Sequence, residues 1–202
     1  GKELDMRTFL TELILIFSLQ SWTKADDISD FQIEGMSIGD SLLDFFTKKE
    51  IRKERKYRIK YPNSNKFTAI TFVEYPNLEV YNSIQVNVKN KDKKYIIYSI
   101  SGIIYFPNNI NKCKERMELI ANELINIFPD ASITKRKKKH EYDKSGKSLI
   151  YQTLFDMDSG AEARVECYDW SKKMLKKHDL DDQLVISLLN DDFSYFMSNE
   201  AY

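Results

Sequence analysis

The segment Gly35-Met36-Ser37-Ile38-Gly39 has the pattern of a nucleophile elbow, in which a serine on a tight strand-to-helix turn attacks an acyl group. Such a serine needs a histidine as general base, and the chain offers His140 and His178. These three residues are therefore the candidate catalytic group of a serine hydrolase. The early position of Ser37 argues against it, because a hydrolase places most of a parallel sheet before its serine. The favoured interpretation is a tight glycine loop that leads into a helix.

The strongest charge cluster lies between residues 135 and 139, where five cations follow one another: Lys135, Arg136, Lys137, Lys138 and Lys139. Such a cluster could bind an anion, for example a lipid head group, a polysaccharide or a phosphate. The favoured interpretation is nevertheless a solvated loop between a helix and a hairpin. Few aromatic residues lie nearby for base stacking, and the whole chain balances 31 basic against 31 acidic residues. We therefore expect no nucleic-acid partner.

Three shorter motifs are incomplete. Gly146-Lys147-Ser148 resembles the end of a phosphate-binding loop, but Glu141 stands where that pattern requires glycine. The segment at residues 156–160 offers two aspartates, yet its glycine comes one position too early for an EF-hand. Residues 178–182 provide one imidazole and three carboxylates, but a loop before the last strand is enough to explain them. We expect neither a metal nor another cofactor.

Residues 1–25 consist of a short upstream stretch and a segment, starting at Met6, with the features of a secretory signal peptide. Arg7 supplies the positive region, residues 9–19 are mostly apolar, and cleavage before Asp26 is expected. The apolar run is shorter than the ~20 residues that span a bilayer, so we expect no transmembrane span after cleavage. The alternative is an amphipathic N-terminal helix, because Glu12 interrupts the apolar run. The favoured interpretation predicts a periplasmic or secreted protein.

The chain has two cysteines, Cys113 and Cys167. Export would place them in an oxidising compartment, where we expect them to form a disulfide between a helix and a strand. The alternative is two buried free thiols.

Aromatic residues and a hydrophobic fraction of 42% exclude disorder as the main state. Ser41 and Asp44 have the spacing of a capping box, which predicts a helix from Asp40 that could continue through residues 48–56. An apolar stripe predicts a second helix over residues 111–128, and a short terminal helix follows residue 191. Alternation predicts strands at residues 31–33, 67–73, 78–88, 95–106, 148–155, 161–168 and 184–189.

These elements predict an α+β fold with antiparallel strands and two main helices on one face. Residues 26–202 would form a single mature domain. It would consist of two tandem helix-then-three-strand units, at about 36–106 and 110–189. Whether the strands form one sheet or two stays open.

The segment Ile33-Glu34-Gly35-Met36-Ser37-Ile38-Gly39-Asp40-Ser41, together with the element order, resembles the beta-lactamase-inhibitor-like fold shared with small outer-membrane assembly lipoproteins. Residues 30–43 more closely resemble uncharacterised exported proteins of marine alphaproteobacteria. These resemblances imply export and envelope association, with an envelope component or another protein as partner. We therefore expect a non-catalytic binding module. The alternatives are a periplasmic hydrolase that uses Ser37 and an anion-binding module that uses residues 135–139.

Overall fold

The computed structural model describes residues 27–202 except 56–58 and 74. The segment interpreted as a signal peptide and the end of the helix expected through residue 56 lie outside the described residues. No helix in the described part is long and apolar enough to cross a membrane.

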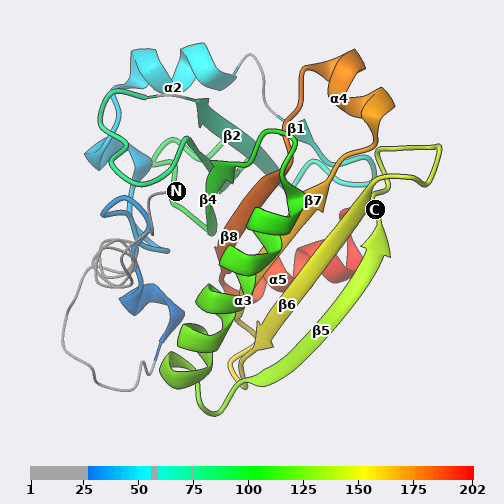
Figure 1. Cartoon of the computed structure of the whole chain (residues 1–202). Helices are drawn as coiled ribbons and strands as arrows, with labels where there is room; N and C mark the ends of the chain where they lie inside the picture. Colours follow the sequence, from blue (N-terminus) through cyan, green and yellow to red (C-terminus); the bar gives the residue numbers. More distant parts are fainter. Residues whose placement is uncertain (1–26, 56–58, 74) are drawn as a thin grey trace.

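One antiparallel sheet of eight strands organises the described residues (Figure 1). The strand order β1-β2-β3-β4-β8-β7-β6-β5 places the first four strands beside the last four, with β4 and β8 at the joint. The strands are β1 (Ile59–Lys60), β2 (Phe67–Val73), β3 (Ser83–Lys89), β4 (Ser99–Tyr105), β5 (Ser132–Lys139), β6 (Leu149–Asp156), β7 (Glu162–Asp169) and β8 (Gln183–Leu189). The α+β prediction is confirmed, and the strands form one sheet.

The helices lie on both faces of this sheet. The long α3 (Ile110–Ile127) packs its apolar stripe into the main core, which α2 (Lys48–Glu54) also joins through Ile51. In contrast, α5 (Asp191–Asn199) covers part of the opposite face with Phe193 and Phe196 (Figure 1). The remaining helical segments are η1 (Ile28–Asp30), η2 (Leu42–Asp44) and α4 (Lys172–His178).

A disulfide joins Cys113 in the first turn of α3 to Cys167 in β7, with the two Cα atoms 6.0 Å apart. The predicted pairing of the two cysteines is therefore present. Both residues are fully buried in the main core, so the bridge fixes the start of α3 against the centre of the sheet.

The helix expected from Asp40 is broken in two, which corrects the prediction. Ser41 caps only the short η2, with its hydroxyl accepting from the backbone N–H of Leu43. The capping box lies instead at Thr47 and Glu50, where each side chain accepts from the backbone N–H of the other. Because Thr47 has extended backbone angles, it starts a new helix at Lys48.

The expected loop at residues 135–139 is wrong, because this segment forms most of β5. Every residue of β5 pairs with β6, from Ser132 opposite Asp156 to Lys139 opposite Leu149. Cross-strand pairing with an apolar neighbour thus decides the conformation of a segment whose own sequence is mostly charged. Conversely, the strand expected at residues 31–33 is absent from the sheet, because Ile33 makes only an isolated bridge with Met36.

Candidate functional site

The structure does not bring the three candidate catalytic residues together. The backbone N–H of Ser37 donates to Asp40 Oδ2 at 2.8 Å, in a loop whose backbone is hydrogen-bonded to Ile97, just before β4. His140 lies at the other end of the sheet, after β5, where its ring packs at a tilt against that of Trp170 with centroids 4.3 Å apart. The ring of His178 instead lies 5.5 Å from that of Tyr142. The Ser37 loop (blue) and the β5–β6 turn (yellow-green) lie on opposite sides of Figure 1.

The five cations of residues 135–139 do not converge on one point either. The pleat of β5 turns Lys135 and Lys137 toward the α3 side, where Lys135 forms an ion pair with Glu118 at 2.6 Å. Arg136 points to the other side and donates to Gln152 Oε1 at 2.7 Å. The cluster is therefore a strand with positive charge on both faces.

The incomplete motifs form turns. Gly146 and Gly160 both have positive φ, at 67° and 87°, and each lies in a hairpin connection. Asp182 Oδ1 accepts from the backbone N–H of Trp170 at 3.0 Å. Within the described ranges, no group of three His, Cys, Asp or Glu side chains is placed to hold a metal ion.

The most polar buried region lies on the sheet face opposite α3, which we call the polar face. Strand pleating places every second residue of β7 there: Glu162, Arg164, Glu166 and Tyr168. The residues between them, including Val165 and Cys167, turn toward α3 and the main core. β7 thus packs against the apolar core with one face and carries buried and half-buried charged side chains on the other.

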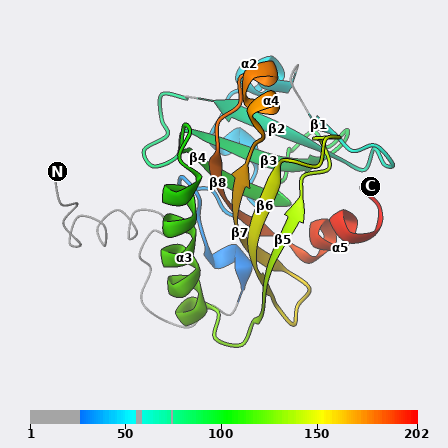
Figure 2. The same cartoon turned by 45° about the vertical axis from the view of Figure 1, so that its right-hand side comes forward.

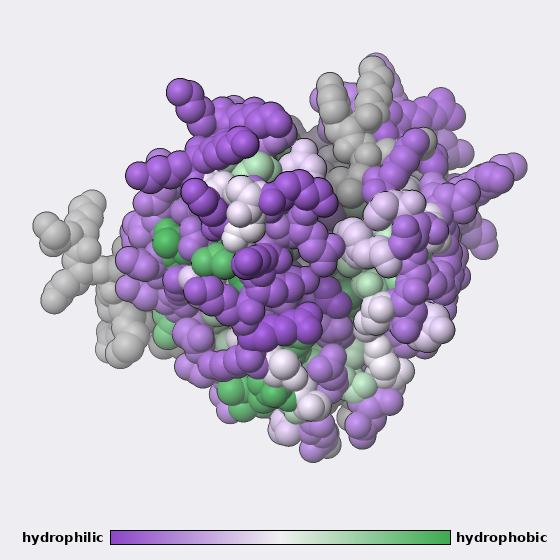
Figure 3. All heavy atoms as spheres, turned by 90° about the vertical axis from the view of Figure 1, so that its right-hand side faces the viewer, coloured by the Kyte–Doolittle hydropathy of each residue, from purple (hydrophilic) through white to green (hydrophobic). Residues whose placement is uncertain are grey.

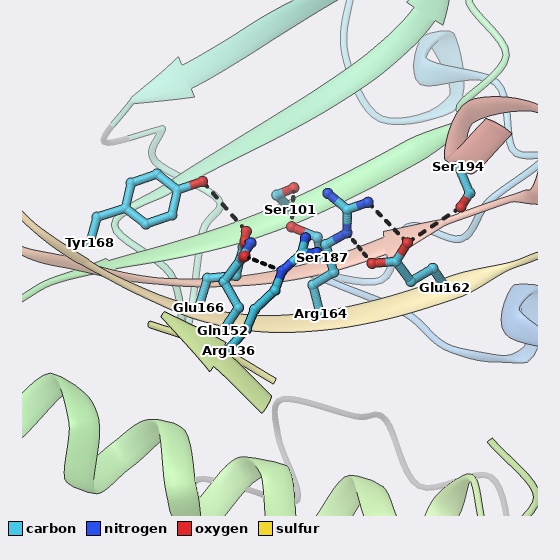
Figure 4. Close-up of polar contacts among 9 residues, drawn as sticks. All are labelled: Ser101, Arg136, Gln152, Glu162, Arg164, Glu166, Tyr168, Ser187 and Ser194. Atoms are coloured by element: carbon cyan, nitrogen blue, oxygen red, sulfur yellow. Dashed lines mark hydrogen bonds and ion pairs between the residues drawn. The ribbon is translucent and has the colours of Figure 1, made fainter. Parts of the chain in front are cut away.

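Arg164 and Glu162 form the central ion pair of the polar face (Figure 4). The guanidinium donates from Nε to Glu162 Oε1 and from Nη2 to Glu162 Oε2, the latter at 2.9 Å. Ser194 of α5 adds a third donor to Glu162 at 3.3 Å. Burial disfavours the charged guanidinium, but the hydrogen bond and charge of Glu162 raise the pKa of Arg164. Arg164 therefore stays cationic although its side chain is only 16% exposed.

A second chain of contacts runs from Glu166 toward the sheet edge. Gln152 Nε2 donates to Glu166 Oε1, and Gln152 Oε1 accepts from Arg136 (Figure 4). Tyr168 donates its hydroxyl to Glu166 Oε2 at 3.4 Å. Burial raises the pKa of Tyr168 well above its usual value, with the charge of Glu166 as a further cause. The phenol therefore remains a neutral hydrogen-bond donor.

Strand register places further polar side chains in line with Arg164. Gln85, Ser101, Ser187 and Arg164 are successive cross-strand partners on β3, β4, β8 and β7. Ser101 and Ser187 share a hydrogen bond of 2.7 Å between their hydroxyl oxygens (Figure 4). Polar side chains thus cross four strands in one row.

This row forms the floor of a hollow of about 140 Å³. Phe193 and Met197 of α5 line it together with Tyr61, and Arg164 and Glu166 are among the charged residues in its lining. Two amides in the lining, Gln85 and Gln183, make no hydrogen bond to another described side chain. The hollow therefore offers spare donors and acceptors beside one positive and one negative group.

Local sequence carries one signal for this site, the alternation Glu162-x-Arg164-x-Glu166-x-Tyr168 in a strand that the periodicity identifies correctly. Polar residues at every second position predict a polar sheet face. The pairing with Gln152 and Ser187 depends on register, which local sequence does not contain. Comparison of the chain with protein family models, with curated proteins and with solved structures finds no match.

Proposed function

We propose that this is an exported, non-catalytic binding module that holds a small zwitterion, of the α-amino-acid type, in the hollow of the polar face. The observation that carries the proposal is the neighbouring pair of opposite charges on one face of β7, the buried Glu166 and the half-buried Arg164. Buried charges are costly unless they are paired, and a ligand with both signs of charge can engage each of them.

The two charged groups have the spacing that such a ligand needs. Same-face neighbours along a strand have Cα atoms about 7 Å apart, so a small ligand can reach both side chains. Arg164 uses Nε and Nη2 for Glu162, which leaves Nη1 to donate to a carboxylate. Glu166 accepts one donor on each oxygen, which leaves lone pairs for an ammonium.

The hollow has a size that limits the ligand. A cavity of about 150 Å³ accommodates benzene, so the hollow of about 140 Å³ fits a ligand of about six to eight heavy atoms. Alanine and serine have this size. The spare amides of Gln85 and Gln183 would serve the polar groups of such a ligand, and Phe193 and Met197 would shield it from water.

Two features support export. Residues 1–25 have the pattern of a secretory signal peptide, and the Cys113–Cys167 disulfide is compatible with an oxidising compartment. The intact mass of the protein recovered from its host, without reductant, tests both. We expect a chain that begins at Asp26 and lacks two hydrogens relative to the free thiols. A mass that retains residues 1–25 would contradict export.

Calorimetric titration with matched small molecules tests the binding proposal. We expect alanine or serine to bind at least about tenfold more tightly than propionate or propylamine, because each of these engages only one of the two charges. Glu166→Gln should remove the preference for the zwitterion over propionate. It keeps the size of the side chain and its acceptor for Gln152.

Glu118→Gln is the matched control, because Glu118 forms its ion pair with Lys135 outside the hollow. This variant should bind like the unchanged protein. Equal affinity for the zwitterion and its two half-molecules, or equal effects of Glu166→Gln and Glu118→Gln, would contradict the proposal.

A further inference from the structure

The β5 strand forms a long, open edge of the sheet. It pairs with β6 on one side only, and all eight of its residues are exposed. The opposite edge, β1, is only two residues long. Figure 2 shows β5 as the outermost strand, and the molecular side that carries it is mostly hydrophilic in Figure 3. An edge strand of this length offers unpaired backbone donors and acceptors to another chain.

The register between β5 and β6 shows which backbone groups of β5 point outward. The N–H of His140 donates to Ser148 O, which makes this pair of residues hydrogen-bonded. Because hydrogen-bonded pairs alternate along an antiparallel ladder, Lys138, Arg136 and Thr134 also direct their backbone groups toward β6. The backbone groups that face away from the sheet therefore belong to the odd-numbered residues: Ile133, Lys135, Lys137 and Lys139.

The side chains of this edge give it a strong positive charge. Arg136 and Lys138 lie on the polar-face side, while Lys137 lies on the α3 side, 5.2 Å from the centroid of the Tyr151 ring. Lys114 of α3 lies 3.8 Å from the same centroid and adds a second ammonium there. Lysines on an edge strand disfavour pairing with a second basic strand, so two copies of β5 would repel each other.

We propose that β5 is a docking strand for an extended acidic peptide of a partner protein, which adds to the sheet as a ninth strand. The outward backbone groups would bind the peptide main chain. Acidic side chains on both faces of the added strand would then lie opposite the cations of β5. This interaction surface is separate from the hollow of the polar face.

Fluorescence anisotropy with a labelled octapeptide of repeating Glu-Glu-Thr-Thr, which places Glu on both faces of an extended strand, tests the proposal on the intact protein. We expect binding at about 20 mM salt that weakens strongly at about 200 mM salt. Lys137→Gln removes one exposed charge and should weaken binding about twofold. Lys137→Pro removes the same charge and an outward N–H, and should weaken it about tenfold or more.

The controls separate strand addition from general attraction of anions. Lys173→Gln, on the equally lysine-rich α4, should leave the affinity unchanged. An octapeptide of the same charge with proline at its centre should bind the unchanged protein poorly. This control does not depend on whether the protein variants fold. Because the Lys137 N–H has no partner in the sheet, Lys137→Pro should keep the circular dichroism spectrum of the unchanged protein.

Three results would overturn the proposal. The unchanged protein fails to bind the octapeptide at low salt, the proline peptide binds as tightly as the regular one, or Lys137→Pro and Lys137→Gln weaken binding equally. Either of the last two results would show that only side-chain charge attracts the peptide.

Discussion

Asp143 shows how much of a local structure can depend on one carboxylate. It is buried, and its two oxygens accept from the backbone N–H and hydroxyl of Ser145, from both groups of Ser148 and from the hydroxyl of Ser171. Ser171 is also the N-cap of α4. The carboxylate therefore connects the β5–β6 turn to the next helix.

These donors, led by Ser148 and Ser145, hold the pKa of Asp143 well below its usual range. A depressed pKa stabilises the folded state above the unfolded pKa of about 4, and this stability is lost as the pH falls further. We expect Asp143→Asn to lower the melting temperature at pH 7 by several degrees. The deficit should shrink progressively below about pH 4, because the carboxyl of the unfolded chain then takes up a proton that the folded carboxyl still resists. Asp158→Asn, at an exposed turn position, should leave the melting temperature unchanged both at pH 7 and below pH 4. A deficit of Asp143→Asn that is equal at these two pH values would contradict this account.

Gly102 is required by a close approach of an aromatic ring. A Cβ at this position would lie 2.3 Å from Tyr81 Cε1, and Tyr81 is only 4% exposed, so the ring has little space to move. We expect Gly102→Ala to destabilise the protein by about 1–3 kcal/mol in urea unfolding. Tyr81→Leu should partly relieve this cost in the double variant, and an unchanged midpoint in Gly102→Ala would contradict the contact.

At the scale of elements, the disulfide determines how firmly α3 is attached to the sheet. It closes a chain separation of 54 residues, for which loop-closure entropy predicts about 3–4 kcal/mol. We expect Cys113→Ala combined with Cys167→Ala to lose about that much in urea unfolding. Reductant should destabilise the unchanged protein and have no effect on the double variant. Equal sensitivity of both proteins to reductant would contradict this explanation.

Sequence periodicity predicts the elements that carry their own apolar pattern. The helix expected at residues 111–128 matches α3 within one residue. The strands expected at residues 148–155 and 161–168 match β6 and β7 within one residue, and those expected at 78–88 and 95–106 contain most of β3 and all of β4. In contrast, β5 was expected to be a loop because its only large apolar side chain is Ile133, and its conformation follows from pairing with β6. The α4 helix was not expected either, since its seven residues are mostly lysines.

The candidate site was missed for the same physical reason. The chain Arg136, Gln152 and Glu166 spans three strands, and only their register places these residues opposite one another. The motif around Ser37, in contrast, is visible in the local sequence but is not completed by the fold. Its five residues satisfy a local pattern, but the two histidines that it needs lie elsewhere in the fold.

At the scale of the whole molecule, the two sets of four strands share one sheet and one core. The joint is the β4–β8 ladder, where Ile100 lies opposite Leu188 and both are buried. The main core contains residues from both sets, from Ile70 and Ile84 to Val165 and Ile186. Neither set therefore buries its apolar face without the other.

This shared core predicts that the protein unfolds in one cooperative step. Trp170 is the only tryptophan in residues 27–202 and reports on the second set of strands, while the methyl signals of Ile70 and Ile84 report on the first. In a urea titration, the fluorescence of Trp170 and these methyl signals should change at the same midpoint. The disulfide cannot impose this coupling, because Cys113 and Cys167 both follow β4. Coupling must pass through the β4–β8 ladder and the core, so two separate midpoints would show that the tandem units are independent domains.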